Sequence, residues 1–285
     1  MKSSYKINLD PLKLYKEFIL SLDQYTDFPH LDTLKKQTLN NLKHKQLGYD
    51  DLASIMYLNS KINEYPYYSK LKCVFIDEAQ DISSLMFLSL RKIFRSASFS
   101  IFGDIAQGIY SYQAIHNWDE VIDIIGECEL LYLTRSYRTS IEIMEDANKT
   151  LSLLGFAPAN NVVRHGDKVD YYHSKDSTHI KSLLEQLNKN FSHTAIICKN
   201  KQELERALQE LSELNLTILD ESNLGYNNNQ NTILTVQTAK GLEFNSVIIY
   251  NLSTYNTNNP NDLKLLYVAK TRALHKLIIN GCEDK

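Results

Sequence analysis

CVFIDEAQD, residues 73–81, joins a short apolar run to two adjacent carboxylates, Asp77 and Glu78. A short apolar run that ends in polar residues is typical of a buried parallel strand. Ligands of parallel α/β sheets gather at the carboxyl ends of the strands. The segment therefore predicts a strand over residues 73–76 whose carboxyl end carries two acidic side chains.

Apolar runs of the same kind recur along the chain and alternate with stretches of helical periodicity. This alternation implies an α/β fold with a mainly parallel sheet. Further strands are expected at residues 98–102, 129–133, 194–198, 246–250 and 276–279. Helices are expected at residues 179–190 and around Leu204, Leu208 and Leu211.

The N-terminal part of the chain has a different texture, rich in Leu, Lys and Tyr. In LDPLKLYKEFILSL (residues 9–22) and YDDLASIMYLNSKI (residues 49–62), apolar residues recur at three- and four-residue spacing. This spacing indicates amphipathic helices. We therefore expect residues 1–70 to form a helical segment ahead of the first strand.

Composition limits the classes of function that the chain can have. Its 285 residues carry a formal net charge of −3, which excludes the basic footprint of a protein that binds nucleic acid by charge alone. The four cysteines form no C-x-x-C pair, so we expect reduced, buried thiols and neither zinc nor disulfides. The sequence contains neither a run of about 18 apolar residues nor an apolar signal peptide, so we expect a cytoplasmic location.

The acid pair at the end of the first predicted strand suits nucleotide chemistry. In P-loop nucleotide hydrolases a strand-end acid holds Mg²⁺ through the nucleotide, and a nearby residue orients the attacking water. Asp77 suits the first role and Glu78 the second. Alternatively, the pair caps the N-terminus of a following helix, where negative charge is favourable.

The string Asp77-Glu78-Ala79-Gln80-Asp81 resembles motif II of the UvrD/Rep-type superfamily 1 DNA helicases, and four further blocks follow in the order found in that family. They are FGDIAQGIYSY (102–112, motif III), LTRSYRTS (133–140, motif IV), TVQTAKGLEF (235–244, motif V) and LLYVAKTRALHKLII (265–279, motif VI). The resemblance implies two RecA-like, P-loop NTPase-type lobes with mainly parallel sheets. Residues 71–132 would form an incomplete first lobe, residues 133–285 the second, and residues 1–70 a remnant of a helical 1B-like domain.

The resemblance also implies roles for individual residues. The catalytic set would be Asp77, Glu78, Gln107 as a γ-phosphate sensor, Arg138 and the arginine finger Arg272. The nucleotide would contact Tyr137 (stacking on adenine), Arg138, Gly241 and Glu243 (at the ribose). Single-stranded DNA would contact Tyr112, Thr235 and Gln237.

The sequence departs from the family at several of these positions. Gln113 and Ala114 follow Tyr112 where relatives have Arg-Gly-Ala, so Tyr112 is equally well interpreted as a core residue. Ser136 replaces the usual Asn, and Gln237 replaces a His common in UvrD. Arg135 and Arg138, three residues apart, could instead form a solvated helix face.

No phosphate-binding loop can be written ahead of Asp77. The first glycine is Gly48, so the pattern G-x-x-x-x-G-K-[ST] is absent there. The stretch 49–63 before the motif II strand and the short spacing between motifs IV and V resemble the HelD (helicase IV-like) branch. We therefore expect the C-terminal part of a helicase motor that uses ATP and Mg²⁺ in its family but is inactive alone, with a P-loop fragment as a missing partner.

The alternative is a non-catalytic, helicase-like module that binds single-stranded DNA or RNA polymerase. RNA polymerase is the partner that the HelD resemblance suggests. A module without catalysis has no physical need for Asp77, Glu78, Arg138, Glu243 and Arg272 together, which favours the motor.

Overall fold

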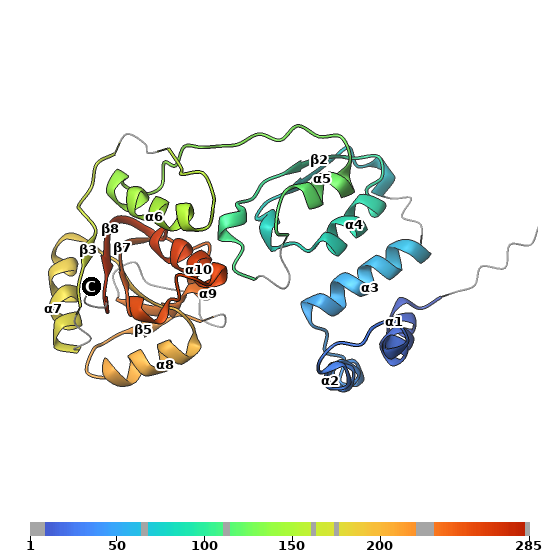
Figure 1. Ribbon diagram of the computed structural model, residues 1–285, viewed down its shortest axis with the longest axis horizontal. Helices are drawn as coiled ribbons and strands as arrows, with labels where there is room; N and C mark the ends of the chain where they lie inside the picture. Colours follow the sequence, from blue (N-terminus) through green and yellow to red (C-terminus); the bar gives the residue numbers. More distant parts are fainter. Residues whose placement is uncertain are drawn as a thin grey trace, which may run out of the picture. The chain divides into compact units, whose positions relative to one another are not determined.

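The computed structural model describes residues 9–63, 68–110, 115–160, 164–173, 177–220 and 231–282. The chain divides into two compact units, one up to Leu130 and one from Leu131 onward. Figure 1 shows the helices and strands of both units. None of the helices in these ranges combines the length and apolar character that crossing a membrane needs.

The first unit begins with three helices, α1 (Pro11–Ser21), α2 (Leu31–Lys43) and α3 (Tyr49–Ile62), which confirms the helical periodicity of the N-terminal stretch. Tyr15 on α1 donates a hydrogen bond of 2.6 Å to Asp51 on α3. The other carboxylate oxygen of Asp51 accepts the backbone N–H of Gly48 at 2.8 Å, which caps the start of α3. One carboxylate thus both starts a helix and holds it against its neighbour.

The rest of the first unit is a small parallel α/β arrangement. Strands β1 (Cys73–Ile76) and β2 (Ser98–Ile101) pair in parallel from Cys73 opposite Ser98 to Ile76 opposite Ile101. Helix α4 (Ser84–Ile93) connects the two strands, and α5 (Asp119–Ile125) follows β2. Short 3-10 turns lie at Leu22–Gln24, Tyr68–Lys70, Ala79–Asp81 and Ile105–Gln107.

The second unit is built on a six-stranded, entirely parallel sheet in the order β3-β8-β7-β4-β6-β5. The strands are β3 (Asp170–Tyr171), β4 (Thr194–Cys198), β5 (Thr217–Ile218), β6 (Thr232–Thr235), β7 (Phe244–Ile249) and β8 (Ala273–Ile279). Its helices are α6 (Ile141–Leu153), α7 (Ser177–Asn190), α8 (Lys201–Glu210), α9 (Val236–Ala239) and α10 (Pro260–Lys270), and a 3-10 turn lies at Leu252–Thr254.

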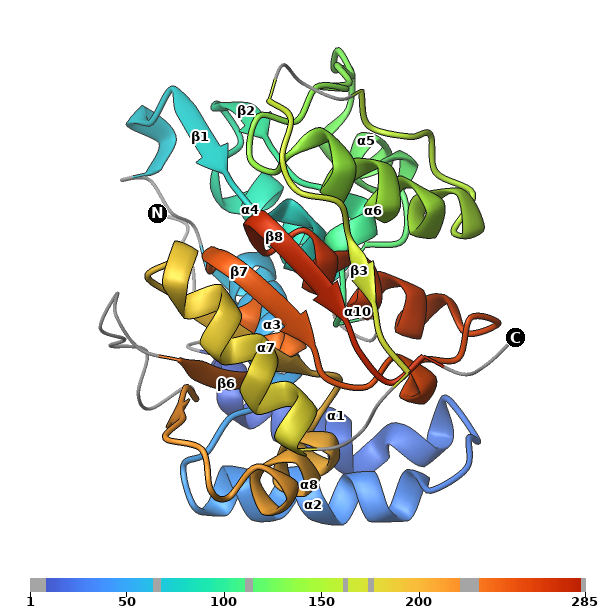
Figure 2. The same cartoon turned by 90° about the vertical axis from the view of Figure 1, so that its left-hand side faces the viewer.

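Helices cover both faces of this sheet. Helices α7 and α8 pack on one face, and α6 and α10 lie on the other (Figures 1 and 2). The core between the sheet and helices α7 and α8 is apolar. It includes Leu183 and Leu187 of α7, Ile196 of β4 and Ile248 of β7. Burial on both faces explains why β4 appears in the sequence as an unbroken apolar run. The expected α/β class with parallel sheets and added helices is confirmed.

One expected strand is wrong. Residues 129–133 form no strand, and the side chains of Leu131, Tyr132 and Leu133 are 72%, 73% and 91% exposed. A strand needs a neighbour that accepts its backbone hydrogen bonds, and nothing in the described ranges pairs with this run. Apolar character alone therefore does not predict a strand at residues 129–133, where one unit ends and the next begins along the chain.

Two smaller expectations also need correction. All four cysteines are free, as expected, but only Cys198 is buried, whereas Cys73 and Cys128 are exposed. The helix-face alternative for Arg135 and Arg138 is wrong, because Arg135 forms an isolated parallel bridge to Asn160 and neither residue lies in a helix.

The sheet of the second unit should depend on its buried centre. We expect Ile196→Ala to lower the free energy of unfolding of this unit by about 2–5 kcal/mol, because Ile196 is fully buried. Ile218→Ala, on an edge strand and 41% exposed, should cost less than about 1.5 kcal/mol. Native-state hydrogen exchange of peptides from β4 and β7 measures both. Equal losses in the two variants would show that the core lies elsewhere.

Candidate nucleotide and nucleic-acid sites

The acid pair lies where the sequence predicts it, directly after β1. Both side chains are exposed, and Asp77 Oδ1 accepts the backbone N–H of Glu78 at 2.9 Å. Glu78 has φ 51° and ψ 38°, the left-handed region that costs a residue with a Cβ. Its side chain makes no capping hydrogen bond, and α4 is capped by Ser83 instead. The alternative that the acid pair caps the following helix is therefore wrong.

Gln80 connects the acid pair to the segment after β2. It is fully buried; its amide nitrogen donates to Glu78 Oε2, and its amide oxygen accepts the backbone N–H of Asp104 at 2.9 Å. Gly103 permits this contact, because a Cβ at this position would lie 2.6 Å from Gln80 Oε1. Gln80 thus holds the Glu78 carboxylate and joins motifs II and III, a role that sequence reasoning missed.

Gln107 belongs to the same network. Its amide nitrogen donates to Asp104 Oδ2 at 2.7 Å, while Asp104 Oδ1 accepts the N–H of Ala106 at 3.0 Å. The predicted phosphate sensor is therefore linked through Asp104 and Gln80 to Glu78. Tyr112, predicted to stack on a DNA base, lies outside the described residues.

In the second unit, three motif blocks meet at the turn between α9 and β7. Arg138 Nε and Glu243 Oε1, both about half exposed, form an ion pair at 2.7 Å. Arg272 Nη1 donates to the carbonyl of Leu242 at 3.4 Å. Gly241 has φ 81°, which glycine alone adopts without strain, and no atom lies within 4 Å of where its Cβ would be. The structure thus brings together four of the residues predicted to serve the nucleotide or its hydrolysis.

Arg272 itself is 1% exposed. Its Nε donates to the carbonyl of Val268 at 3.2 Å and its Nη2 to Thr271 Oγ1 at 3.3 Å. A guanidinium carries five N–H donors, and burial requires that they find acceptors. The arginine-finger role therefore stays a prediction, and it requires this side chain to exchange at least one of its present acceptors for a phosphate oxygen.

The surroundings of Arg138 show a further residue that sequence reasoning missed. Arg164 Nη2 donates to the carbonyl of Arg138 at 3.0 Å and to that of Leu274 at 2.7 Å. It therefore fixes the backbone of motif IV to the start of β8. Tyr137, which precedes Arg138 in the chain, is 72% exposed, and an exposed ring suits stacking on a base. The sequence around Arg164 is mainly polar and contains no motif, so it did not predict these two hydrogen bonds.

Two of the three residues predicted to contact DNA, Thr235 and Gln237, lie at the other edge of the sheet. Thr235 ends β6, and its hydroxyl accepts the N–H of Thr238 at 3.3 Å, which caps α9. Gln237 lies half-buried on α9. Because the strands are parallel, Thr235 at a carboxyl end and Glu243 at an amino end belong to opposite edges.

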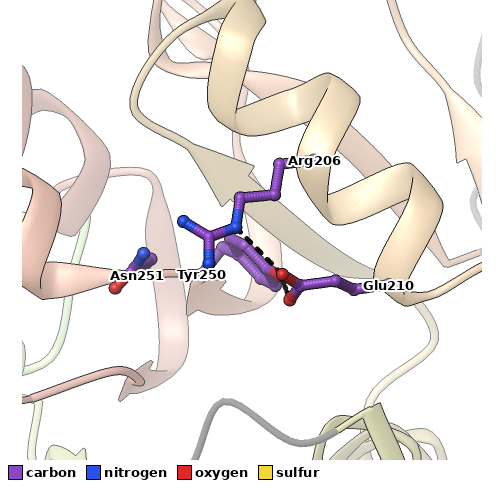
Figure 3. Close-up of a pocket in the computed structure, with 4 residues that line it drawn as sticks. All are labelled: Arg206, Glu210, Tyr250 and Asn251. Atoms are coloured by element: carbon purple, nitrogen blue, oxygen red, sulfur yellow. Dashed lines mark hydrogen bonds and ion pairs between the residues drawn. The ribbon is translucent and has the colours of Figure 1, made fainter.

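A small hollow follows the carboxyl end of β7, lined by Arg206, Glu210, Tyr250 and Asn251 (Figure 3). Arg206 Nε donates to Glu210 Oε1 at 2.9 Å, and the Tyr250 hydroxyl donates to Glu210 Oε2. Burial and the Glu210 carboxylate raise the pKa of Tyr250. These groups satisfy one another, and the six-residue strand β7 separates them from Glu243. The hollow is therefore not part of either candidate site.

The residues present fit a magnesium ion only together with a nucleotide. Among the described residues, no group of three or more His, Cys, Asp or Glu side chains could hold a metal alone. Mg²⁺ is usually held by one or two carboxylates and by substrate phosphates. Asp77, an exposed carboxylate at a strand end, matches that kind of site.

Two protein-family models match this chain, and together they cover both units. Residues 131–284, more than half of the chain, match the UvrD-like helicase C-terminal domain, and residues 8–119 match the UvrD/REP helicase N-terminal domain.

Individual relatives are distant and longer. The chain is 25% identical over 298 aligned positions to the putative ATP-dependent DNA helicase R568 of Acanthamoeba polyphaga mimivirus, covering 90% of this chain and 42% of that protein. It is 26% identical over 112 residues to the ATP-dependent DNA helicase Rep of Buchnera aphidicola, covering 37% of this chain and 17% of Rep. The chain thus spans less than half the length of these relatives.

A solved structure, the C-terminal domain of a possible DNA helicase from Lactobacillus plantarum, is 24% identical with a TM-score of 0.41, covering 51% of this chain and 87% of that one. On the two family matches, with five motif blocks in order, this chain belongs to the UvrD-like helicases.

Proposed function

We propose that this chain supplies the hydrolytic acids and the phosphate-facing arginines of an ATP-dependent superfamily 1 helicase motor that moves on single-stranded DNA. One observation carries the proposal. Arg138, Glu243 and Arg272, from three separate motif blocks, converge on the turn at Gly241 and Leu242. Side chains of this kind around one turn suit a nucleotide better than a structural role, because the Arg138–Glu243 pair is half exposed and stabilises the fold little.

The first unit would provide the acids. Asp77 would hold Mg²⁺ through the nucleotide, and Glu78 would orient the attacking water and accept its proton. Gln80 supports this role, because its buried amide holds Glu78 Oε2 in a fixed direction. Gln107 would report the state of the phosphate through Asp104 to the same amide.

The second unit would provide recognition and positive charge. Tyr137, largely exposed, would stack on adenine, and Glu243 would bind the ribose. Arg138 and Arg272 would face the phosphates, where a planar, permanently charged fork is well suited. ATP bound with Mg²⁺ would supply the free energy for stepping along DNA.

The phosphate-binding loop has to come from residues other than those ahead of Asp77. Two features of the first unit support a loop-bearing strand docking there. Among the described residues β1 and β2 pair only with each other, which leaves both outer edges open. Phe75 on β1 and Phe102 after β2 are 73% and 52% exposed, although parallel strands are normally covered.

The HelD branch and a cytoplasmic location are part of this proposal and rest on sequence features alone. A non-catalytic module that binds single-stranded DNA or RNA polymerase is the competing function, and the two experiments below separate it from the motor.

We expect the chain alone to hydrolyse no ATP, because the pattern G-x-x-x-x-G-K-[ST], whose backbone N–H groups cradle the phosphates, is absent ahead of Asp77. Addition of a fragment of a UvrD-like relative that carries the P-loop and its strand should restore turnover. Glu78→Gln should then reduce that turnover about 10²- to 10⁴-fold, the range of a lost general base. A phosphate-release assay measures all three.

The matched control is Glu127→Gln, an exposed acid in the same unit outside every motif block. It should leave restored turnover unchanged. Hydrolysis by the chain alone that disappears in Glu78→Gln would overturn the predicted dependence on a separate loop.

Binding of a fluorescent oligo-dT should weaken linearly on a double-logarithmic plot as salt rises, because phosphate contacts release counterions. Gln237→Ala should lower the affinity roughly 2- to 12-fold, the value of one lost hydrogen bond. Gln209→Ala, exposed on α8, is the control and should have no effect. Fluorescence anisotropy gives the affinities. Equal binding by both variants would remove Gln237 from the DNA site, and tight binding without restorable hydrolysis would favour the non-catalytic module.

A further inference from the structure

A buried ion pair of the second unit joins α6 and α10, which cover one face of the sheet. Lys270 Nζ on α10 lies 2.6 Å from Asp146 Oδ1 on α6, and the two side chains are only 6% and 2% exposed. The motif resemblance implies a role for neither residue. The pair therefore needs its own explanation.

Further contacts make this pair a junction of three elements. Lys270 Nζ donates to Thr150 Oγ1 at 3.1 Å, one turn along α6. The hydroxyl of Tyr171 on β3 donates to Asp146 Oδ2, and Lys149 Nζ lies 3.3 Å from the same oxygen. Helices α6 and α10 and edge strand β3 are thus held by one carboxylate.

Stability alone does not account for such a pair. Removing two charges from water costs free energy that their attraction rarely exceeds, and apolar residues of similar volume often serve as well or better. Burial works to raise the pKa of Asp146, but the charge of Lys270 and three hydrogen bonds hold it below its usual value. Burial lowers the pKa of Lys270 against the pull of Asp146. Unlike apolar contacts, the ion pair is directional. Its geometry fixes which turn of α10 faces which turn of α6.

The pair lies close in sequence to both arginines of the candidate nucleotide site. Lys270 ends α10, two residues before Arg272. Asp146 is on α6, whose N-cap Ser140 follows Arg138 by two residues. Fixing α6 against α10 therefore fixes the two chain segments from which Arg138 and Arg272 reach the Leu242–Glu243 turn.

We propose that Lys270 and Asp146 are positioning residues that set the register of α10 on α6 and thereby hold the Arg272 guanidinium in its place beside the Leu242–Glu243 turn. This rests on the proposed function for its catalytic meaning. The geometric claim itself concerns only the second unit and can be tested without nucleotide.

The test follows the Nε–H signal of Arg272 by NMR of the full chain with labelled arginine. In the wild type this proton should exchange slowly, because it is buried and donates to Val268. Lys270→Met and Asp146→Asn should each speed its exchange by about tenfold or more relative to the strands of the same unit, since the helix end opens locally.

Leu187→Ala is the matched control. Leu187 on α7 is buried against the opposite face of the sheet, so its truncation should destabilise the unit without a selective effect on Arg272. If Lys270→Met and Asp146→Asn speed exchange uniformly, as Leu187→Ala does, the pair is merely structural and the proposal is wrong.

The double variant Asp146→Leu/Lys270→Met tests the same proposal if the single variants fail to fold. We expect it to fold, because no unpaired charge is left buried, while Arg272 Nε–H still exchanges faster than in the wild type. Wild-type protection of Arg272 in this double variant would overturn the proposal. Absence of restorable ATP hydrolysis in the wild type would instead refute the proposed function and leave the geometric result standing.

Discussion

The parallel pairing of β4 with β7 is the interaction on which the second unit depends. Ala195, Ile196 and Ile197 on one strand and Val247, Ile248 and Ile249 on the other are completely buried, with helices over both faces. Because the strands run in one direction, loops at their amino ends and loops at their carboxyl ends form two separate edges. Glu243 precedes β7 and Thr235 ends β6, so the nucleotide and nucleic-acid candidates are kept apart by the length of the sheet.

Elements whose patterns are dictated locally were predictable from sequence. Strands β1 and β4 and helix α3 have the predicted bounds, because full burial or helical spacing shows directly in the order of residues. The run 129–133 has the same apolar character but forms no strand, since pairing depends on a neighbour that local sequence cannot show. Strands β3 and β5, of two residues each, are too short to produce a pattern.

The charged residues of the candidate site were predictable from sequence, but the residues that hold them in position were not. Glu78, Arg138 and Glu243 belong to recognisable blocks. Gln80 and Arg164, in contrast, also bind backbone groups 24 to 110 positions away, which local sequence does not show. Buried polar groups need partners, and the partners are set by the fold. The left-handed backbone of Glu78 is a second such feature, since strain at a strand end persists only where surrounding contacts such as those of Gln80 impose it.

The burial of Arg272 limits how a UvrD-like motor could use it. A guanidinium inside the unit has to keep its donors satisfied, and its acceptors in this structure include the neutral carbonyls of Val268 and Leu242 and the Thr271 hydroxyl. Hydrogen bonds from a charged donor to a charged acceptor are roughly twice as strong as neutral ones. A phosphate near the Leu242–Glu243 turn would therefore compete well for Nη1, the donor with the longest of these contacts, while Nε stays on Val268. On the proposed function, Arg272 would then meet a phosphate by exchanging the Leu242 carbonyl as an acceptor, without leaving the position that α10 gives it.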